Sequence, residues 1–82
     1  MTIEVKFSSS ELAEVLRSGP YDMPEGSTVE ELVNSAQAEA GFNMTRELAK
    51  NLVFLYNNRH AAWETVLNES GKLRVLHKVL GG

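Results

Sequence analysis

Apolar and polar residues alternate near the N-terminus, as they do in a half-buried β-strand. Ile3, Val5 and Phe7 fall on one side of residues 2–8, and polar side chains fall on the other. A second segment, residues 52–56, is a continuous apolar run that predicts a strand with apolar side chains on both faces. We expect further strands at residues 21–24, 60–64 and 73–79.

Residues 28–40 follow the spacing of an amphipathic helix. Thr28 and Glu31 fit the capping box that opens a helix, and Gly41 suits the positive φ that often ends one. The apolar stripe recurs at i, i+3, i+4 and i+7, and it consists of Val29, Leu32, Val33, Ala36 and Ala40.

A shorter segment is predicted on either side of this helix. Residues 9–18 have apolar residues at helical spacing, and Ser8 with Glu11 fits a second capping box, so we expect a short helix or an ordered loop there. A helical turn is also expected near residues 45–50.

The order of elements predicts one α+β domain over residues 1–82, with the main helix on one face of a sheet. If Phe54 and Val75 point to the helix, Leu55 and Leu76 fall on the other face, because strand side chains alternate. An apolar patch there is typical of a docking surface. The alternative is that the other parity is buried, or that residues 9–18 cover this face.

Composition excludes several classes of protein. The net charge of −3, with eight scattered Lys and Arg residues, argues against nucleic-acid binding and favours a locally basic protein partner. The chain has no cysteine, which excludes disulfides and thiolate metal sites. No apolar run approaches the roughly 20 residues that span a bilayer, and the first residues do not resemble a secretion signal, so we expect a cytoplasmic protein.

The side chains offer little catalytic chemistry. His60 and His77 are far apart in sequence and no cluster of carboxylates accompanies them, so neither a metal site nor a bound cofactor is expected. No arrangement of a nucleophile with a base predicts an enzyme. Trp63 is either an interface anchor or, more commonly for a lone tryptophan, a core residue.

The sequence ends in Gly81 and Gly82, which chance rarely places together: at about 7% glycine, the pair is roughly a 0.5% event. One interpretation is a frayed end. The other is functional, because a segment without side chains can pass through a narrow channel and present its carboxylate to an active site. We expect residues 78–82 to form a flexible tail.

These features together resemble a known family, the β-grasp (ubiquitin-like) sulfur carriers of the molybdopterin-synthase small-subunit and ThiS type. The resemblance implies a mixed sheet of four or five strands, with the first and last strands as parallel neighbours at its centre. The segments that carry it are residues 2–8, 24–32, 56–57, 73–76 and 79–82.

The resemblance also implies a function. The protein would be a co-substrate rather than an enzyme, and an adenylyltransferase of the ubiquitin-activating type would adenylate the carboxylate of Gly82. A sulfur donor would convert the adenylate to a thiocarboxylate. This would deliver sulfur to an acceptor enzyme, such as the large subunit of molybdopterin synthase or thiazole synthase. The residues expected to bind partners are Leu55, Leu76, Lys78, Val79 and Leu80, beside Gly81 and Gly82.

Two alternatives remain open. Leu80 resembles the leucine of ubiquitin-type tails, so the chain could be a protein modifier that is conjugated through Gly82 to lysine. It could also be an adaptor that binds partners through its sheet and makes no use of its tail.

Overall fold

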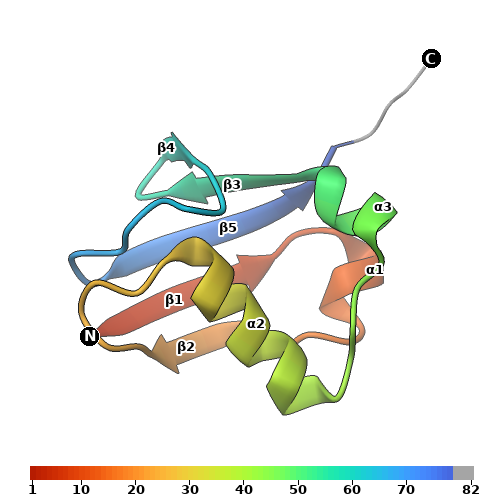
Figure 1. Cartoon of the computed structure of the whole chain (residues 1–82), viewed down its shortest axis with the longest axis horizontal. Coiled ribbons are helices and arrows are strands. Elements are labelled where there is room, and N and C mark those ends of the chain that lie inside the picture. The colour runs from red at the N-terminus through yellow and green to blue at the C-terminus, as the bar shows by residue number, and fades with distance from the viewer. Residues whose placement is uncertain (79–82) are drawn as a thin grey trace.

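The computed structural model describes residues 1–78, which form a five-stranded sheet with three helices around it (Figure 1). In chain order, the elements are β1 (Thr2–Phe7), α1 (Ser10–Ala13), β2 (Gly19–Asp22), α2 (Val29–Ala40), α3 (Arg46–Lys50), β3 (Leu52–Tyr56), β4 (Arg59–Ala61) and β5 (Gly71–His77). The strands lie in the order β2-β1-β5-β3-β4. Neighbouring strands are antiparallel except β1 and β5, which are parallel.

This arrangement confirms the predicted β-grasp. Figure 1 shows α2 lying across one face of the sheet, with α1 and α3 near the end of the sheet where β5 finishes. The core lies between α2 and the sheet, and every strand except the short β4 contributes buried side chains to it. These core residues include Ile3, Val5, Phe7, Tyr21, Leu32, Val33, Phe54, Leu73 and Val75.

The start and end of α2 follow the predicted chemistry. The Thr28 side chain accepts a hydrogen bond from the Glu31 amide at 3.2 Å, and the Glu31 carboxylate accepts one from the Thr28 amide at 2.9 Å. Each side chain thus satisfies a backbone donor that the first helical turn leaves unpaired. Gly41 ends the helix in the left-handed region, with φ of 66°. Ala40, predicted to belong to the apolar stripe, is exposed.

Other boundaries differ from the predictions. The capping box at Ser8 is wrong: α1 begins at Ser10 with Ser9 as its N-cap, and no side chain caps it. The strand expected at 21–24 is β2, which begins earlier, at Gly19. It can include Pro20, which has no N–H group, because β2 is an edge strand of the sheet. The strands expected at 60–64 and 73–79 are β4 (Arg59–Ala61) and β5 (Gly71–His77).

The turn between β3 and β4 also fixes the start of β5. Asn57 and Asn58 both have positive φ, 51° and 67°, which asparagine tolerates in a tight hairpin. The Asn57 side chain accepts a hydrogen bond from the Lys72 amide at 2.9 Å. A Cβ at Gly71 would overlap the side-chain amide of Asn57, so only glycine leaves room for this contact.

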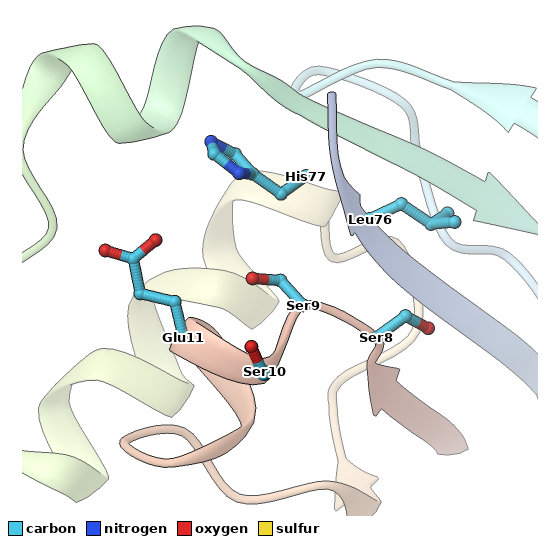
Figure 2. A pocket seen from close by; sticks show the side chains of 6 residues that line it. All are labelled: Ser8, Ser9, Ser10, Glu11, Leu76 and His77. Carbon is cyan, nitrogen blue, oxygen red and sulfur yellow. The ribbon is translucent and has the colours of Figure 1, made fainter. Parts of the chain in front are cut away.

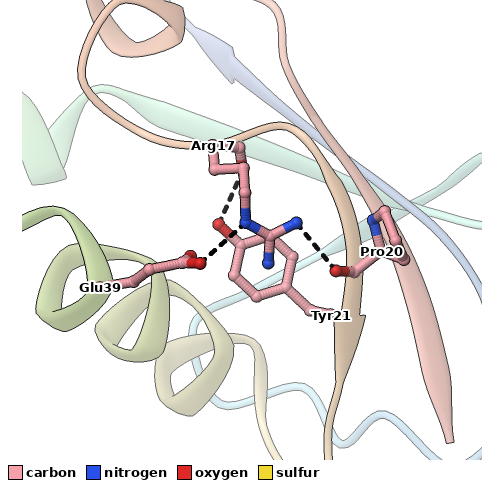
Figure 3. Close-up of polar contacts among 4 residues, drawn as sticks. All are labelled: Arg17, Pro20, Tyr21 and Glu39. Atoms are coloured by element: carbon pink, nitrogen blue, oxygen red, sulfur yellow. Dashed lines mark hydrogen bonds and ion pairs between the residues drawn. The ribbon is translucent and has the colours of Figure 1, made fainter.

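The free edge of β2 is covered by one arginine (Figure 3). Arg17 donates to the carbonyl of Pro20 at 3.0 Å and to the carboxylate of Glu39, near the end of α2, at 2.9 Å. Its guanidinium lies 4.1 Å from the centroid of the Tyr21 ring. The Tyr21 hydroxyl donates to the Arg17 carbonyl at 2.7 Å, and burial raises the pKa of this phenol. These contacts tie the segment after α1 to both β2 and α2.

Hydrogen exchange tests the strand order. Because β5 has a hydrogen-bonded strand on each side, we expect amides of residues 73–77 to exchange only through large-scale opening, together with those of residues 3–7. Amides of the edge strand β4 should exchange faster. Rapid exchange throughout residues 73–77 would contradict the central position of β5.

Candidate functional site at the end of β5

The chain leaves the sheet from its central strand. Beyond His77, the last residue of β5, the Lys78 amide donates to the Asn51 carbonyl at 2.6 Å. On the other side of β5, the Ser8 amide donates to the Val75 carbonyl at 2.9 Å. Backbone contacts from two neighbouring segments therefore hold the strand up to the point where the tail starts.

The Lys78 contact gives α3 a structural role. Asn51 is the C-cap residue of α3, and its side chain donates to the Glu47 carbonyl at 3.0 Å. The helix is opened by Thr45, whose side chain accepts from the Leu48 amide at 3.1 Å. This five-residue helix, predicted as a turn, thus positions the carbonyl that holds the root of the tail.

Two of the predicted partner-binding residues lie together on the face of the sheet opposite α2. Phe54 and Val75 are buried toward the helix, so Leu55 and Leu76 project from the other face, where both are half-buried. Val53 lies beside Leu76 in the register of β3 and β5, and it joins them. These three side chains form an apolar surface close to the start of the tail.

Two cations border this apolar surface. Lys6 and Arg74 are partners in the parallel register of β1 and β5, and Arg74 is also the partner of Leu55. Both side chains are exposed. We call the combined surface the tail-side patch, and its members are Lys6, Val53, Leu55, Arg74 and Leu76.

The charge of this patch reverses one expectation. The net charge of the whole chain favours a locally basic partner. The described strands place two carboxylates on this face, Glu4 and Asp22, and both lie further from the tail than the two cations do. Glu4 is beside Lys72, and Asp22 accepts a hydrogen bond from the Thr2 hydroxyl at 3.1 Å. The tail-side patch is therefore locally positive and suits a partner with acidic side chains around an apolar centre.

A cleft of about 400 Å³ lies next to the patch, at the end of β1 and β5 (Figure 2). Leu76 and His77 leave β5 on opposite sides, with His77 on the side of Ser9 and Glu11. Serine hydroxyls and one carboxylate give this cleft hydrogen-bonding capacity beside the tail. Its lining residues are Ser8, Ser9, Ser10, Glu11, Leu76 and His77.

Most of the remaining predicted site residues lie outside the part of the chain that the structure describes. Lys78 is exposed, whereas Val79, Leu80, Gly81 and Gly82 lie outside residues 1–78, as does nearly all of the predicted flexible tail. Within those residues, no group of three or more His, Asp or Glu side chains comes together as a metal site would require. None of the three helices is long and apolar enough to cross a membrane.

The fold and the site define a class of protein: a ubiquitin-like β-grasp domain whose tail extends from the central strand of its sheet. The chain belongs to the ThiS family, whose model matches residues 9–82. Members of this family are small sulfur-carrier proteins rather than catalysts.

Solved structures agree on the fold. The chain is similar to SAMP1 from Haloferax volcanii, with a TM-score of 0.73, 19% sequence identity and 100% of each chain covered. It is also similar to a protein described as molybdopterin converting factor subunit 1 from Pyrococcus furiosus, with a TM-score of 0.69 and 15% identity. That match covers 96% of this chain and 99% of the other. No protein with a curated description matches the sequence significantly.

Sequence reasoning missed several residues of this region. Strand alternation places Val53 and Arg74 on the same face as Leu55 and Leu76, so parity alone could have found them. Lys6 could be assigned to the patch only once the register of β1 against β5 was known. Nothing in the sequence indicates the role of Asn51, because this residue holds Lys78 through its backbone carbonyl and not through its side chain.

Replacing Lys78 tests the anchor of the tail. Lys78→Pro removes the amide that donates to Asn51, so we expect the free energy of unfolding to fall by about 1 kcal/mol. Lys78→Ala retains the amide and serves as the matched control, with no expected change because the side chain is exposed. Urea denaturation measures both variants, and equal stabilities would show that the hydrogen bond does not hold the tail root.

Proposed function

We propose that this protein is a sulfur carrier whose C-terminal carboxylate, on Gly82, is adenylated and then converted to a thiocarboxylate. The observation that carries the proposal is the position of the tail in a chain of the ThiS family. The two terminal glycines follow the central strand β5 in the sequence, a few residues after Leu76 of the tail-side patch.

The chemistry requires activation because a carboxylate is a poor acyl donor. A Gly82 carboxylate oxygen attacks the α-phosphorus of ATP held by the partner, and pyrophosphate leaves. Hydrosulfide released by a sulfur donor then attacks the carbonyl of the mixed anhydride, AMP leaves, and the thiocarboxylate remains on Gly82 with no change of oxidation state. Splitting one difficult substitution into two easier ones is the general benefit of such an intermediate.

The tail-side patch would dock the adenylyltransferase. Leu55 and Leu76 supply the apolar centre, and Arg74 and Lys6 attract acidic side chains. From Lys78, the four remaining residues span at most about 14 Å when extended. Val79 and Leu80 would line the entrance to the partner's active site, and Gly81 would bring Gly82 to the nucleotide.

In this proposal the protein is a co-substrate and not an enzyme. Its partners are an adenylyltransferase of the ubiquitin-activating type and a sulfur-acceptor enzyme, of the kind represented by the molybdopterin-synthase large subunit or thiazole synthase. The need for ATP as co-reactant favours a reaction in the cytoplasm. The sulfur carried would enter a cofactor under construction, of the molybdopterin or thiamin type.

Intact mass spectrometry tests the reaction. After incubation with the cognate adenylyltransferase, ATP and a sulfur donor, we expect one oxygen of Gly82 to be replaced by sulfur. Deleting Gly82, or adding one alanine after it, should abolish this change, because the carboxylate then no longer reaches the nucleotide at the correct length. Circular dichroism should show an unchanged fold in both variants.

The same experiment distinguishes the alternatives. A covalent adduct to a lysine, without thiocarboxylate, would show that the protein is a modifier conjugated through Gly82. If neither product forms and deletion of the glycines has no effect in the cell, the sulfur-carrier proposal is wrong and the adaptor interpretation holds.

A pair of neighbouring substitutions tests the docking surface. Leu76→Asp places a charge on the open face, so we expect the fold to persist while the KM of activation for this protein rises at least tenfold. Val75→Asp places an unpaired charge in the core, and the cost of several kcal/mol should unfold a domain of roughly 5–15 kcal/mol stability. Thermal melts and activation kinetics measure the two effects, and unchanged kinetics in folded Leu76→Asp would exclude the patch.

A further inference from the structure

A second hollow lies on the helix side of the molecule, on the face opposite the tail-side patch. This groove, of about 350 Å³, has one wall from α2 and another from α3 and the segment before it, with an indole between them. Its lining residues are Glu30, Asn34, Gln37, Met44, Ala49 and Trp63. We call it the Trp63 groove.

Trp63 belongs both to the core and to the surface. Its ring meets Phe54 edge to face, with centroids 4.8 Å apart and an interplanar angle of 78°. Its carbonyl accepts a hydrogen bond from the Glu30 amide at 2.9 Å, which holds the tryptophan against the first turn of α2. The side chain is nevertheless only half-buried, because part of it lines the groove. The indole is thus fixed in place with part of its surface available to a ligand.

The wall opposite is also held in place. The Gln37 side chain accepts a hydrogen bond from the Met44 amide at 2.8 Å and donates to Asn34 Oδ1 at 3.4 Å. The first of these bonds connects α2 to the segment that leads into α3, and the second lies within α2. The groove is therefore formed before any partner arrives, which lowers the entropic cost of binding.

The charge of the groove is negative. Glu30 is the one charged residue that lines it, and among residues 1–78 its carboxylate takes part in no ion pair. From α3, the groove receives Ala49 and not the charged side chains, and Lys50 pairs with Glu47 at 3.6 Å. A groove lined by a carboxylate together with aromatic and aliphatic side chains suits a guanidinium group.

We propose that the Trp63 groove binds an arginine side chain of a partner protein. The guanidinium plane stacks on the indole and pairs with the Glu30 carboxylate, while the aliphatic stem packs on Met44 and Ala49. Arginine fits better than lysine because its planar, weakly hydrated head stacks on aromatic faces. Since the groove and the tail-side patch lie on opposite faces, a second protein can bind while the tail is engaged.

The chain's single tryptophan reports directly on this site. We expect titration with N-acetyl-arginine amide to change Trp63 fluorescence saturably, in the millimolar range for one side chain. The uncharged isostere N-acetyl-citrulline amide should bind much more weakly. Amide chemical shifts should move most at Glu30, Met44 and Ala49.

Two substitutions with the same change of charge provide the control. Glu30→Gln should weaken arginine binding about tenfold, whereas Glu25→Gln, in a loop away from the groove, should leave it unchanged. Equal effects of the two would mean that only net charge matters and would overturn the proposal. Equal binding of citrulline would do the same.

Two further measurements separate arginine binding from self-association and from the sulfur-carrier function. If the fluorescence changes with protein concentration alone and the mass in solution doubles, a second copy occupies the groove and the arginine proposal is wrong. Leu76→Asp should leave arginine binding unchanged, because it alters only the opposite face. Arginine binding in the groove can therefore be confirmed even if the sulfur-carrier proposal is wrong, and it can be disproved while that proposal holds.

Discussion

The parallel pairing of β1 with β5 is the constraint on which the rest of the structure depends. It aligns Ile3 with Gly71 and Phe7 with Val75, and so brings segments almost 70 positions apart into one ladder. Closing so large a loop has an entropic cost that local hydrogen bonds alone do not offset. The burial of α2 against the paired strands supplies the compensation, since Leu32, Val33 and Ala36 are wholly buried there.

This pairing also determines where the chain leaves the sheet. Because β5 is flanked by β1 and β3, its end is held by backbone contacts on both sides, through Ser8 and Asn51. A tail that left an edge strand would lack one of these supports. The strand that leads to residues 79–82 is therefore the best-supported strand of the sheet.

The two sides of the molecule differ in their charged groups. On the open face, Lys6 and Arg74 surround half-buried leucines, which suits an acidic partner. On the helix side, Glu30 and Trp63 line the same groove, which suits a basic one. A net charge of −3 averages over these opposed surfaces, and it therefore describes neither of them.

The sequence by itself determined whatever depends on local periodicity and local chemistry. The strand alternation at Ile3–Val5–Phe7, the capping box at Thr28, the left-handed Gly41 and the asparagine turn all act within a few residues, so their patterns are visible in the chain. The same alternation separated Leu55 and Leu76 from Phe54 and Val75, but only the structure showed which pair faces α2. Only the tertiary structure decided which segments meet: Lys6 with Arg74, Lys78 with Asn51, and Glu30 with Trp63. These contacts depend on the register of the strands and on the positions of backbone carbonyls. Both are set by the packing of the whole core, so the spacing of side chains along the chain does not reveal them.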